Sequence, residues 1–215
     1  MKTIATSSSF LDGKAALGVL IRFEDDTPSE NENKVNEALG GVLARNAERT
    51  RFKGKPRQAV AMDTLGKLPF ETILVLGVGK RSELTGATLR DAGAAAVNEA
   101  ISRHYDDVAM DVTELGGEHA GECLIGGHLG SYRFDEFQAA PEDGPRASLA
   151  SLTVTGCDLS DAQTARYDAV AEGVCLARKL INEPPNICTP IRLADLAEEI
   201  GKAPGFEVSI LDRQQ

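Results

Sequence analysis

The sequence predicts an α/β domain built on a largely parallel or mixed sheet. Stretches of strand length alternate along the chain with helical stretches of about ten to twenty residues, which is the pattern of sheets whose strands are joined through helices. The segment Ala15–Phe23 (AALGVLIRF) is a continuous apolar run, as expected for a strand that is covered on both faces. Hydrophobic residues make up 42% of the 215 residues and aromatic residues only 5%, so we expect an aliphatic, alanine-rich core.

The first part of the domain contains one predicted helix among several strands. The acidic, polar segment 24–33 (EDDTPSENEN) predicts an exposed loop before the helix, which begins near Glu32. Gly40-Gly41 weaken this helix, by about 1 kcal/mol per glycine relative to alanine. Its apolar side is formed by Val35, Leu39, Val42 and Leu43. The strands are predicted at Ile4–Thr6, Ala15–Phe23, Gln58–Met62 and Glu71–Leu76.

The second part of the domain contains two helices that are rich in small residues. Leu89–His104 has an apolar face at helical spacing, and Gly117–Gly130 has similar spacing with many glycines. Segment 131–138 (SYRFDEFQ) predicts a strand or an extended corner, and 140–147 predicts a loop. Strands are predicted at Val108–Val112 and Ser148–Thr155.

A long helix and a proline corner follow the domain. Ser160 is the expected N-cap of a helix that runs to Ile181, with Val170 and Val174 on its apolar side together with Ile181. Pro184 and Pro185 end this helix, because proline lacks the amide donor and pushes the preceding residue out of the helical conformation.

A second unit begins directly after the corner. Thr189-Pro190 is an N-cap followed by proline at the first helical position, and a strand is predicted at Phe206–Leu211. We therefore predict an α/β domain over 1–160, an interdomain helix and proline hinge over 161–189, and the start of a truncated second α/β unit over 190–215.

The charge of the chain argues against a general polyanion binder. The formal net charge is −10, with 33 acidic against 23 basic residues. One segment, Arg45–Arg57, is nonetheless basic, and it predicts either a nucleic-acid contact or a solvated turn and strand edge. The second interpretation is favoured, because the segment has no binding motif and no aromatic residue except Phe52. Without a membrane span or a signal peptide, the sequence points to the cytoplasm.

Other candidate residues have structural interpretations that compete with functional ones. Gly77-Val78-Gly79-Lys80 follows a buried strand, but it matches neither the dinucleotide-binding nor the P-loop pattern, so a tight connection is favoured over a phosphate site. The cysteines have no metal-ligand spacing and are expected to be buried free thiols, and the histidines are expected at caps, on the surface or in packed positions. The residues concerned are Cys123, Cys157, Cys175, Cys188, His104, His119 and His128.

Three segments resemble the leucine aminopeptidase (cytosol aminopeptidase) family of metallopeptidases. The first is LARKLINEPPNICTP (176–190), which contains the pattern A-R-x-L-x-N-x-P-x-N from Ala177 to Asn186. The second is Gly130–Asp135, similar to a G-x-Y-R-F-D corner, and the third is ILVLGVGKRSELT (73–85), similar to a V-L-x-G-L-G-K strand and turn. They occur in the expected order across almost the whole chain.

The resemblance implies an N-terminal α/β domain of macro-domain-like fold and a catalytic domain that binds two divalent metal ions, manganese or zinc. The full enzyme would release N-terminal amino acids from peptides and assemble as a homohexamer. The lysine-bearing G-K-G segment and the N-T-D-A-E-G-R-L segment that carry the family's metal ligands do not occur in this sequence. No catalytic, metal-binding or cofactor-binding residue is therefore assigned to this chain, and Asp212 matches no ligand motif.

The resemblance leaves three functional hypotheses. The favoured one is a catalytically silent N-terminal portion of a leucyl aminopeptidase, which serves assembly and access to the active site and has its own catalytic domain as partner. The second is a macro-type module that binds ADP-ribose or another nucleotide. The third is DNA binding through segment 45–57.

Overall fold

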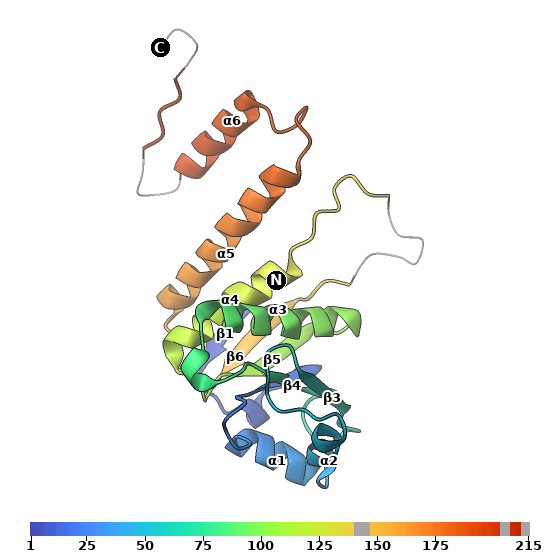
Figure 1. The fold of residues 1–215 in the computed structure, drawn as a ribbon. Coiled ribbons are helices and arrows are strands. Elements are labelled where there is room, and N and C mark those ends of the chain that lie inside the picture. The colour runs from blue at the N-terminus through green and yellow to red at the C-terminus, as the bar shows by residue number, and fades with distance from the viewer. Residues whose placement is uncertain (140–146, 203–206, 212–215) are drawn as a thin grey trace. The chain divides into compact units, whose positions relative to one another are not determined.

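The computed structural model describes residues 1–139, 147–202 and 207–211 and divides into two units, Met1–Gly173 and Val174–Gln215. The first unit has three layers, a central sheet with helices on both faces (Figure 1). It contains the short 3-10 helices Phe10–Asp12 and Arg81–Glu83. Its helices are α1 (Glu30–Ala38), α2 (Val42–Arg49), α3 (Gly86–Ser102), α4 (Gly117–Ser131) and the first part of α5 (Asp161–Asn182).

The six-stranded sheet has the order β1-β6-β5-β2-β4-β3. All neighbours pair in parallel except β3 and β4, which form an antiparallel pair at one edge. The predicted α/β fold with a mixed sheet and flanking helices is thus confirmed. The strands are β1 (Lys2–Thr6), β2 (Leu17–Arg22), β3 (Ala59–Asp63), β4 (Thr72–Gly77), β5 (Asp107–Asp111) and β6 (Ser151–Thr155).

Two hydrophobic clusters cover the two faces of the sheet. Helices α3 and α4 pack on one face, where Leu89, Val97 and Leu124 are fully buried. Helices α1 and α2 pack on the other face through Val35 and Leu43. The strand β2 lies between these layers, and its residues Leu17, Val19 and Leu20 are 0% exposed, as its continuous apolar sequence predicts.

Helices α3 and α4 approach each other closely at glycines. A Cβ atom on Gly93 would lie 2.1 Å from the carbonyl oxygen of Cys123, and one on Gly126 would lie 2.0 Å from the carbonyl oxygen of Arg90. Side chains at these positions would therefore force the helices apart, which explains why both helices are rich in small residues.

The structure corrects the prediction for segment 24–33 and the single helix after it. Helix α1 begins at Glu30, because the Ser29 side chain accepts a hydrogen bond from the Glu32 amide. Gly40 and Gly41 both have positive φ, so they separate α1 from α2 rather than weaken one helix. The exposed-loop prediction is wrong at Glu32, which is 3% exposed.

The structure also corrects predictions near the second domain boundary. The predicted apolar side of α5 is exposed at Val170 and Val174, and Ala171 is the buried residue of this helix among those described. Segment 131–138 begins with the last residue of α4 and then leaves the helix in an extended conformation at Tyr132, so of the two predicted alternatives the extended corner fits and the strand does not. A strand is predicted at Phe206–Leu211, but residues 207–211 form no strand. Phe206 lies outside the described residues.

The second unit contains the proline corner and helix α6 (Pro190–Gly201). The amides of Ile187 and Cys188 both donate to the carbonyl of Pro184, at 2.9 and 3.0 Å, which closes the corner after α5. The Thr189 side chain then accepts from the Arg192 amide at 3.2 Å, so the predicted N-cap is confirmed.

Candidate functional site

In folds of this type, binding sites usually lie at the carboxyl ends of the parallel strands. After β2 the chain enters α1 on one face of the sheet, whereas after β5 it enters α4 on the other face (Figure 1). Ligands of open α/β sheets bind where neighbouring strands diverge in this way. A pocket of about 470 Å³ lies here. Its lining comes from Ser7–Ser9, Ser29–Asn31, Lys34, Asp111, Thr113, Glu114 and Gly156–Asp158.

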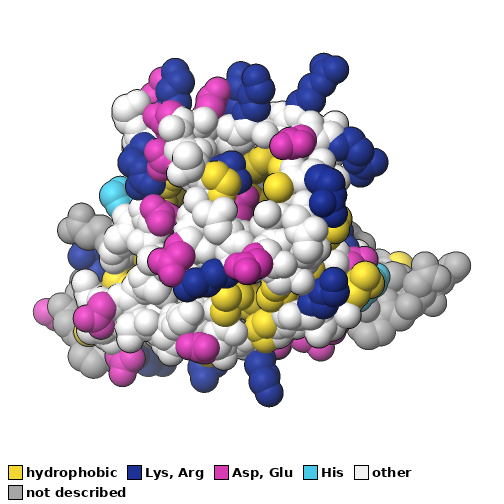
Figure 2. Space-filling view, turned by 90° about the horizontal axis from the view of Figure 1, so that it is seen from below, with side chains coloured by type: hydrophobic (Ala, Val, Ile, Leu, Met, Phe, Trp, Pro, Cys, Tyr) yellow, Lys and Arg dark blue, Asp and Glu magenta, His cyan; other side chains and the backbone are white. Residues whose placement is uncertain are grey.

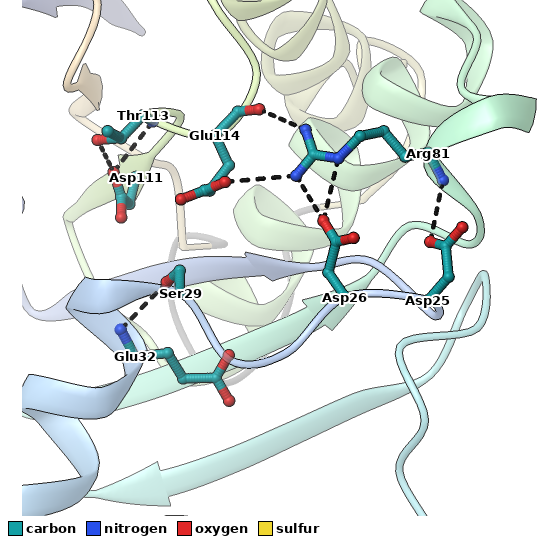
Figure 3. Close-up of polar contacts among 8 residues, drawn as sticks. All are labelled: Asp25, Asp26, Ser29, Glu32, Arg81, Asp111, Thr113 and Glu114. Carbon is teal, nitrogen blue, oxygen red and sulfur yellow. Dashed lines mark hydrogen bonds and ion pairs between the residues drawn. The ribbon is translucent and has the colours of Figure 1, made fainter.

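Asp111, at the end of β5, is the most buried acidic residue of this pocket. It is 5% exposed, and its carboxylate is fully bonded. The Asn31 side-chain amide donates to one oxygen at 2.7 Å. The Thr113 hydroxyl and backbone amide donate to the other oxygen at 2.6 and 3.1 Å (Figure 3). With all its partners inside the protein, Asp111 joins α1 to β5 and leaves little acceptor capacity for a ligand.

Arg81 clamps the loops that follow three strands. Its guanidinium donates to the Asp26 carboxylate at 2.6 and 3.0 Å and to the Glu114 carbonyl at 2.9 Å (Figure 3). It also lies 4.0 Å from the centre of the Phe23 ring. Its backbone amide donates to Asp25 at 3.3 Å. The hydrogen bond to Asp26 raises the pKa of Arg81. These contacts tie the loops after β2, β4 and β5 together.

A buried ion pair lies beside this clamp. Glu32 of α1 accepts hydrogen bonds from the guanidinium of Arg22, the last residue of β2, and the Nε contact is 2.7 Å. The Glu32 side chain is 4% exposed and the Arg22 side chain 16%. The sequence does not indicate this pair, because Glu32 lies in a polar stretch and the burial of a charge there depends on another layer of the fold.

The chemistry available at the carboxyl ends is limited. Four acids and one lysine line the pocket, so it does not favour an anionic ligand such as a diphosphate. Among the described residues, no group of three or more histidine, cysteine or acidic side chains could hold a metal ion. Of the pocket serines, the Ser8 hydroxyl lies 2.9 Å from the Thr6 hydroxyl and the Ser29 hydroxyl caps α1, so these two side chains have local structural partners.

The glycine-rich turn at residues 77–80 is explained by packing. A Cβ on Gly77 would lie 2.2 Å from the Lys55 carbonyl oxygen, and the Gly79 amide, at positive φ, donates to the Gly54 carbonyl at 2.8 Å. The turn therefore lets the loop 54–56 cross close to the end of β4. A short 3-10 helix rather than an α-helix follows the turn, which removes the geometry of a phosphate site.

The basic segment Arg45–Arg57 spans two kinds of structure. Arg45 and Arg49 lie on α2, contrary to the predicted turn and strand edge, and the other four basic residues lie in the loop before β3. All six are exposed, and three of them contact neutral or acidic groups of the protein itself. On the face drawn in Figure 2, Lys and Arg side chains lie among Asp and Glu side chains.

The histidines and cysteines lie apart from each other. His104 is exposed at positive φ after α3, and a ring nitrogen of His119 lies 2.9 Å from the Leu115 carbonyl oxygen. Cys123 and Cys157 are buried, and burial raises the pKa of both, in Cys123 to about 12. None of the four forms a disulfide, but Cys175 and Cys188 are partly exposed, so the prediction of buried thiols is correct for Cys123 and Cys157 and wrong for these two.

Three residues, Thr3, His128 and Asp168, hold the start of α5 against the domain, and we call this group the latch. No sequence pattern indicates it. The Thr3 hydroxyl of β1 lies 2.6 and 2.7 Å from the two Asp168 oxygens, and His128 Nε2 of α4 lies 3.1 Å from one of them. The Tyr167 ring fills the space beside Gly121, where a Cβ would lie 2.0 Å from it. The latch residues are up to 165 positions apart, so no local pattern indicates them.

Exposed apolar side chains gather in the last part of the chain. Nine of the twelve large hydrophobic side chains that are exposed among the described residues lie at or after Val170. Ile181 is 82% exposed and Ile191 is 75% exposed. Among the described residues, Glu183 at the proline corner has the one buried side-chain oxygen without a hydrogen-bond partner. In the described part of the chain, no helix has both the length and the apolar character needed to span a membrane.

Comparison with known proteins gives consistent matches. A sequence model described as "Cytosol aminopeptidase family, N-terminal domain" matches residues 17–141. A probable cytosol aminopeptidase of Alkaliphilus oremlandii is 30% identical over 207 residues, which cover 91% of this chain and 42% of that protein. Another, from Rhizobium etli, is 35% identical over 181 residues, covering 81% and 36%. This chain spans about two fifths of the length of these relatives.

Solved structures show the same fold. A mutant of tomato leucine aminopeptidase superposes with a TM-score of 0.81 at 24% identity, covering 94% of this chain and 42% of that one. The bottromycin maturation enzyme BotP in complex with Mn superposes with a TM-score of 0.64 at 26% identity, covering 87% and 36%.

Proposed function

This chain belongs to the cytosol aminopeptidase family, whose N-terminal domain it contains, and from that premise we propose that it is the non-catalytic N-terminal portion of a metal-dependent aminopeptidase. The whole protein would release N-terminal amino acids from peptides in the cytoplasm, as a homohexamer. In this proposal, 1–160 is the domain proper, 161–189 the connecting helix and hinge, and 190–215 the start of the catalytic domain.

The exposed apolar residues after Val170 carry this proposal. Many exposed large apolar side chains in one segment are typical of a surface that another domain or chain covers. The first unit leaves few large apolar side chains exposed, so its own core is satisfied. The contrast supports a catalytic domain that packs over α6 and the second half of α5.

The buried oxygen of Glu183 supports the same conclusion. A buried carboxylate oxygen without a partner costs on the order of 1–3 kcal/mol, more if it is charged, and native proteins rarely leave one. Glu183 lies in the segment that resembles the entrance to the family's catalytic domain. We propose that a donor from the catalytic domain completes its hydrogen bonding.

The metal ions are proposed to bind outside this chain. The sequence lacks the family's ligand segments, and BotP, a structural relative, was solved in complex with Mn. Manganese or zinc in the catalytic domain would polarise the peptide carbonyl and activate a water molecule. The first unit would contribute assembly contacts and shape access to that site.

Calorimetric titration of this chain with Mn²⁺ and with Zn²⁺ tests where the metals bind. We expect no saturable heat in the low micromolar range. A stoichiometric site for two ions in this chain would contradict the proposal, because the catalytic metals would then be held here. Titration with ADP-ribose in the same experiment addresses the nucleotide hypothesis, which the acidic pocket does not favour.

A further inference from the structure

The free edge of the sheet at β3 has the composition of a pairing surface. Its residues, AVAMD, include no lysine and no proline, two residues that commonly prevent an edge strand from pairing with another chain, and the one charged residue, Asp63, lies at its end. The opposite edge differs, because β1 begins with exposed Lys2 and its Thr3 is engaged by Asp168. The edge at β3 is therefore the less protected of the two.

The hydrogen bonds at the ends of β3 show which backbone groups face outward. The Gly77 amide donates to the Gln58 carbonyl and the Thr64 amide donates to the Glu71 carbonyl, both at 2.8 Å. Because bonding alternates along an antiparallel pair, Ala59, Ala61 and Asp63 direct their backbone groups away from β4. None of these outward groups has a backbone partner in the described part of the chain.

We propose that β3 pairs antiparallel with β3 of a second copy of this chain, with Val60 on the twofold axis. This register places Ala59 opposite the partner subunit's Ala61, so that both outward-facing residues exchange hydrogen bonds. The sheet then continues through the dimer as one twelve-stranded layer, twice the six strands of one copy. The interface is small, so we expect dissociation in the micromolar range.

The side chains along β3 fit this register. Ala59 and Ala61 face the α3 side, where Ala59 lines a groove of about 490 Å³ together with Thr88 and Ala95. Small side chains on this side leave room for two adjacent copies of α3. Beyond the ladder, the register brings exposed Arg57 near the partner subunit's Asp63. Asp63 lies 3.5 Å from Arg103 of its own chain, but its side chain is 69% exposed and can contact a second guanidinium, and the twofold axis makes this contact twice.

Sedimentation velocity across the micromolar range tests the dimer, with Ala61→Pro as the first variant. Proline at an outward-facing position of an edge strand removes no bond within the sheet, but it removes the donor that the partner needs. The matched control is Ala5→Pro in β1, where the Lys2 amide donates to Ala150 and the alternation directs Ala5 outward. We expect a dimer for the wild type and Ala5→Pro, and a monomer for Ala61→Pro.

Charge exchange tests the register and does not depend on whether Ala61→Pro folds. Arg57→Glu and Asp63→Arg should each weaken the dimer about tenfold by placing like charges together, and the double variant should restore it. A monomeric wild type at high micromolar concentration would overturn the proposal. So would a dimer that persists in folded Ala61→Pro, or single charge variants that associate as tightly as the wild type.

Discussion

The ion pair of Arg22 and Glu32 fastens the first turn of α1 to the carboxyl end of β2. Glu32→Gln keeps the shape of the side chain but leaves the buried guanidinium without its counter-charge, so we predict a loss of about 3 kcal/mol in the free energy of unfolding. Urea unfolding followed by far-UV circular dichroism measures this loss.

Glu30→Gln is the control for that prediction. Glu30 is exposed in the same turn and pairs with Lys34 at 2.6 Å on the helix surface, a contact that lowers the pKa of Glu30. Because water screens this pair, the variant should be close to the wild type in stability. Equal effects of the two substitutions would show that the burial of Glu32 has no energetic consequence.

At Gly93, the packing of α3 against α4 reverses the usual effect of replacing glycine by alanine in a helix. Alanine normally stabilises a helix interior relative to glycine, but here its Cβ would meet the Cys123 carbonyl at 2.1 Å. We predict that Gly93→Ala destabilises the protein by about 2 kcal/mol through separation of α3 and α4. Gly173→Ala in α5 has nothing within 4 Å of its Cβ and should be neutral or slightly stabilising. Thermal unfolding of both variants measures these two changes in stability.

The thiols should divide into two reactive classes. The raised pKa values of Cys123 and Cys157 keep these buried thiols protonated, so a disulfide reagent at pH 8 should modify Cys175 and Cys188 first. Since unfolded thiols ionise at about pH 8.5 and folded Cys123 only at about 12, stability should fall as the pH rises above the first value. Mass spectrometry of partially labelled protein tests the order, and early labelling of Cys123 would contradict it.

At the scale of single residues, the sequence could predict the caps but not the buried charges. The side chains of Ser160 and Thr189 accept hydrogen bonds from backbone amides three residues later, as expected of N-caps, and both helix starts are predicted correctly. The roles of Glu32 and Asp168 depend on partners that are distant in the sequence or on burial by another layer. Such roles follow only from the tertiary structure.

At the scale of elements, the start of α5 depends on its latch. Asp168→Ala removes the acceptor shared by Thr3 and His128, at about 1 kcal/mol per hydrogen bond. We predict about tenfold faster amide exchange over 161–173, with little change in β2. Hydrogen exchange with mass spectrometry measures it, and Glu172→Ala, on the exposed side of α5, is the control. Unchanged exchange in Asp168→Ala would mean that the latch does not hold α5.

The strands and the alanine-rich helices could be predicted because their patterns are local. The face of α5 could not, because the sequence spacing of Val170 and Val174 indicates an apolar stripe but not the partner that covers it. In the described structure this stripe is exposed and Ala171 faces the domain instead. The carboxyl-end pocket likewise requires the strand order, which the sequence alone does not determine.

At the scale of the whole molecule, the two units have opposite surface properties. Met1–Gly173 closes its own core on both faces of the sheet and ties its loops with Arg81 and Asp111. The chain after Val170 exposes apolar side chains and contains the unpartnered oxygen of Glu183. This asymmetry agrees with the proposal that another domain covers the apolar side chains after Val170.

Hydrolysis of leucyl amide by the purified chain, with Mn²⁺ or Zn²⁺ added, tests the central claim most directly. If this chain is the non-catalytic portion of an aminopeptidase, its rate should equal that of a mock purification with either metal. Turnover that requires the metal, exceeds the mock purification and co-elutes with the chain would contradict the account, because the chain would then contain a catalytic centre of its own.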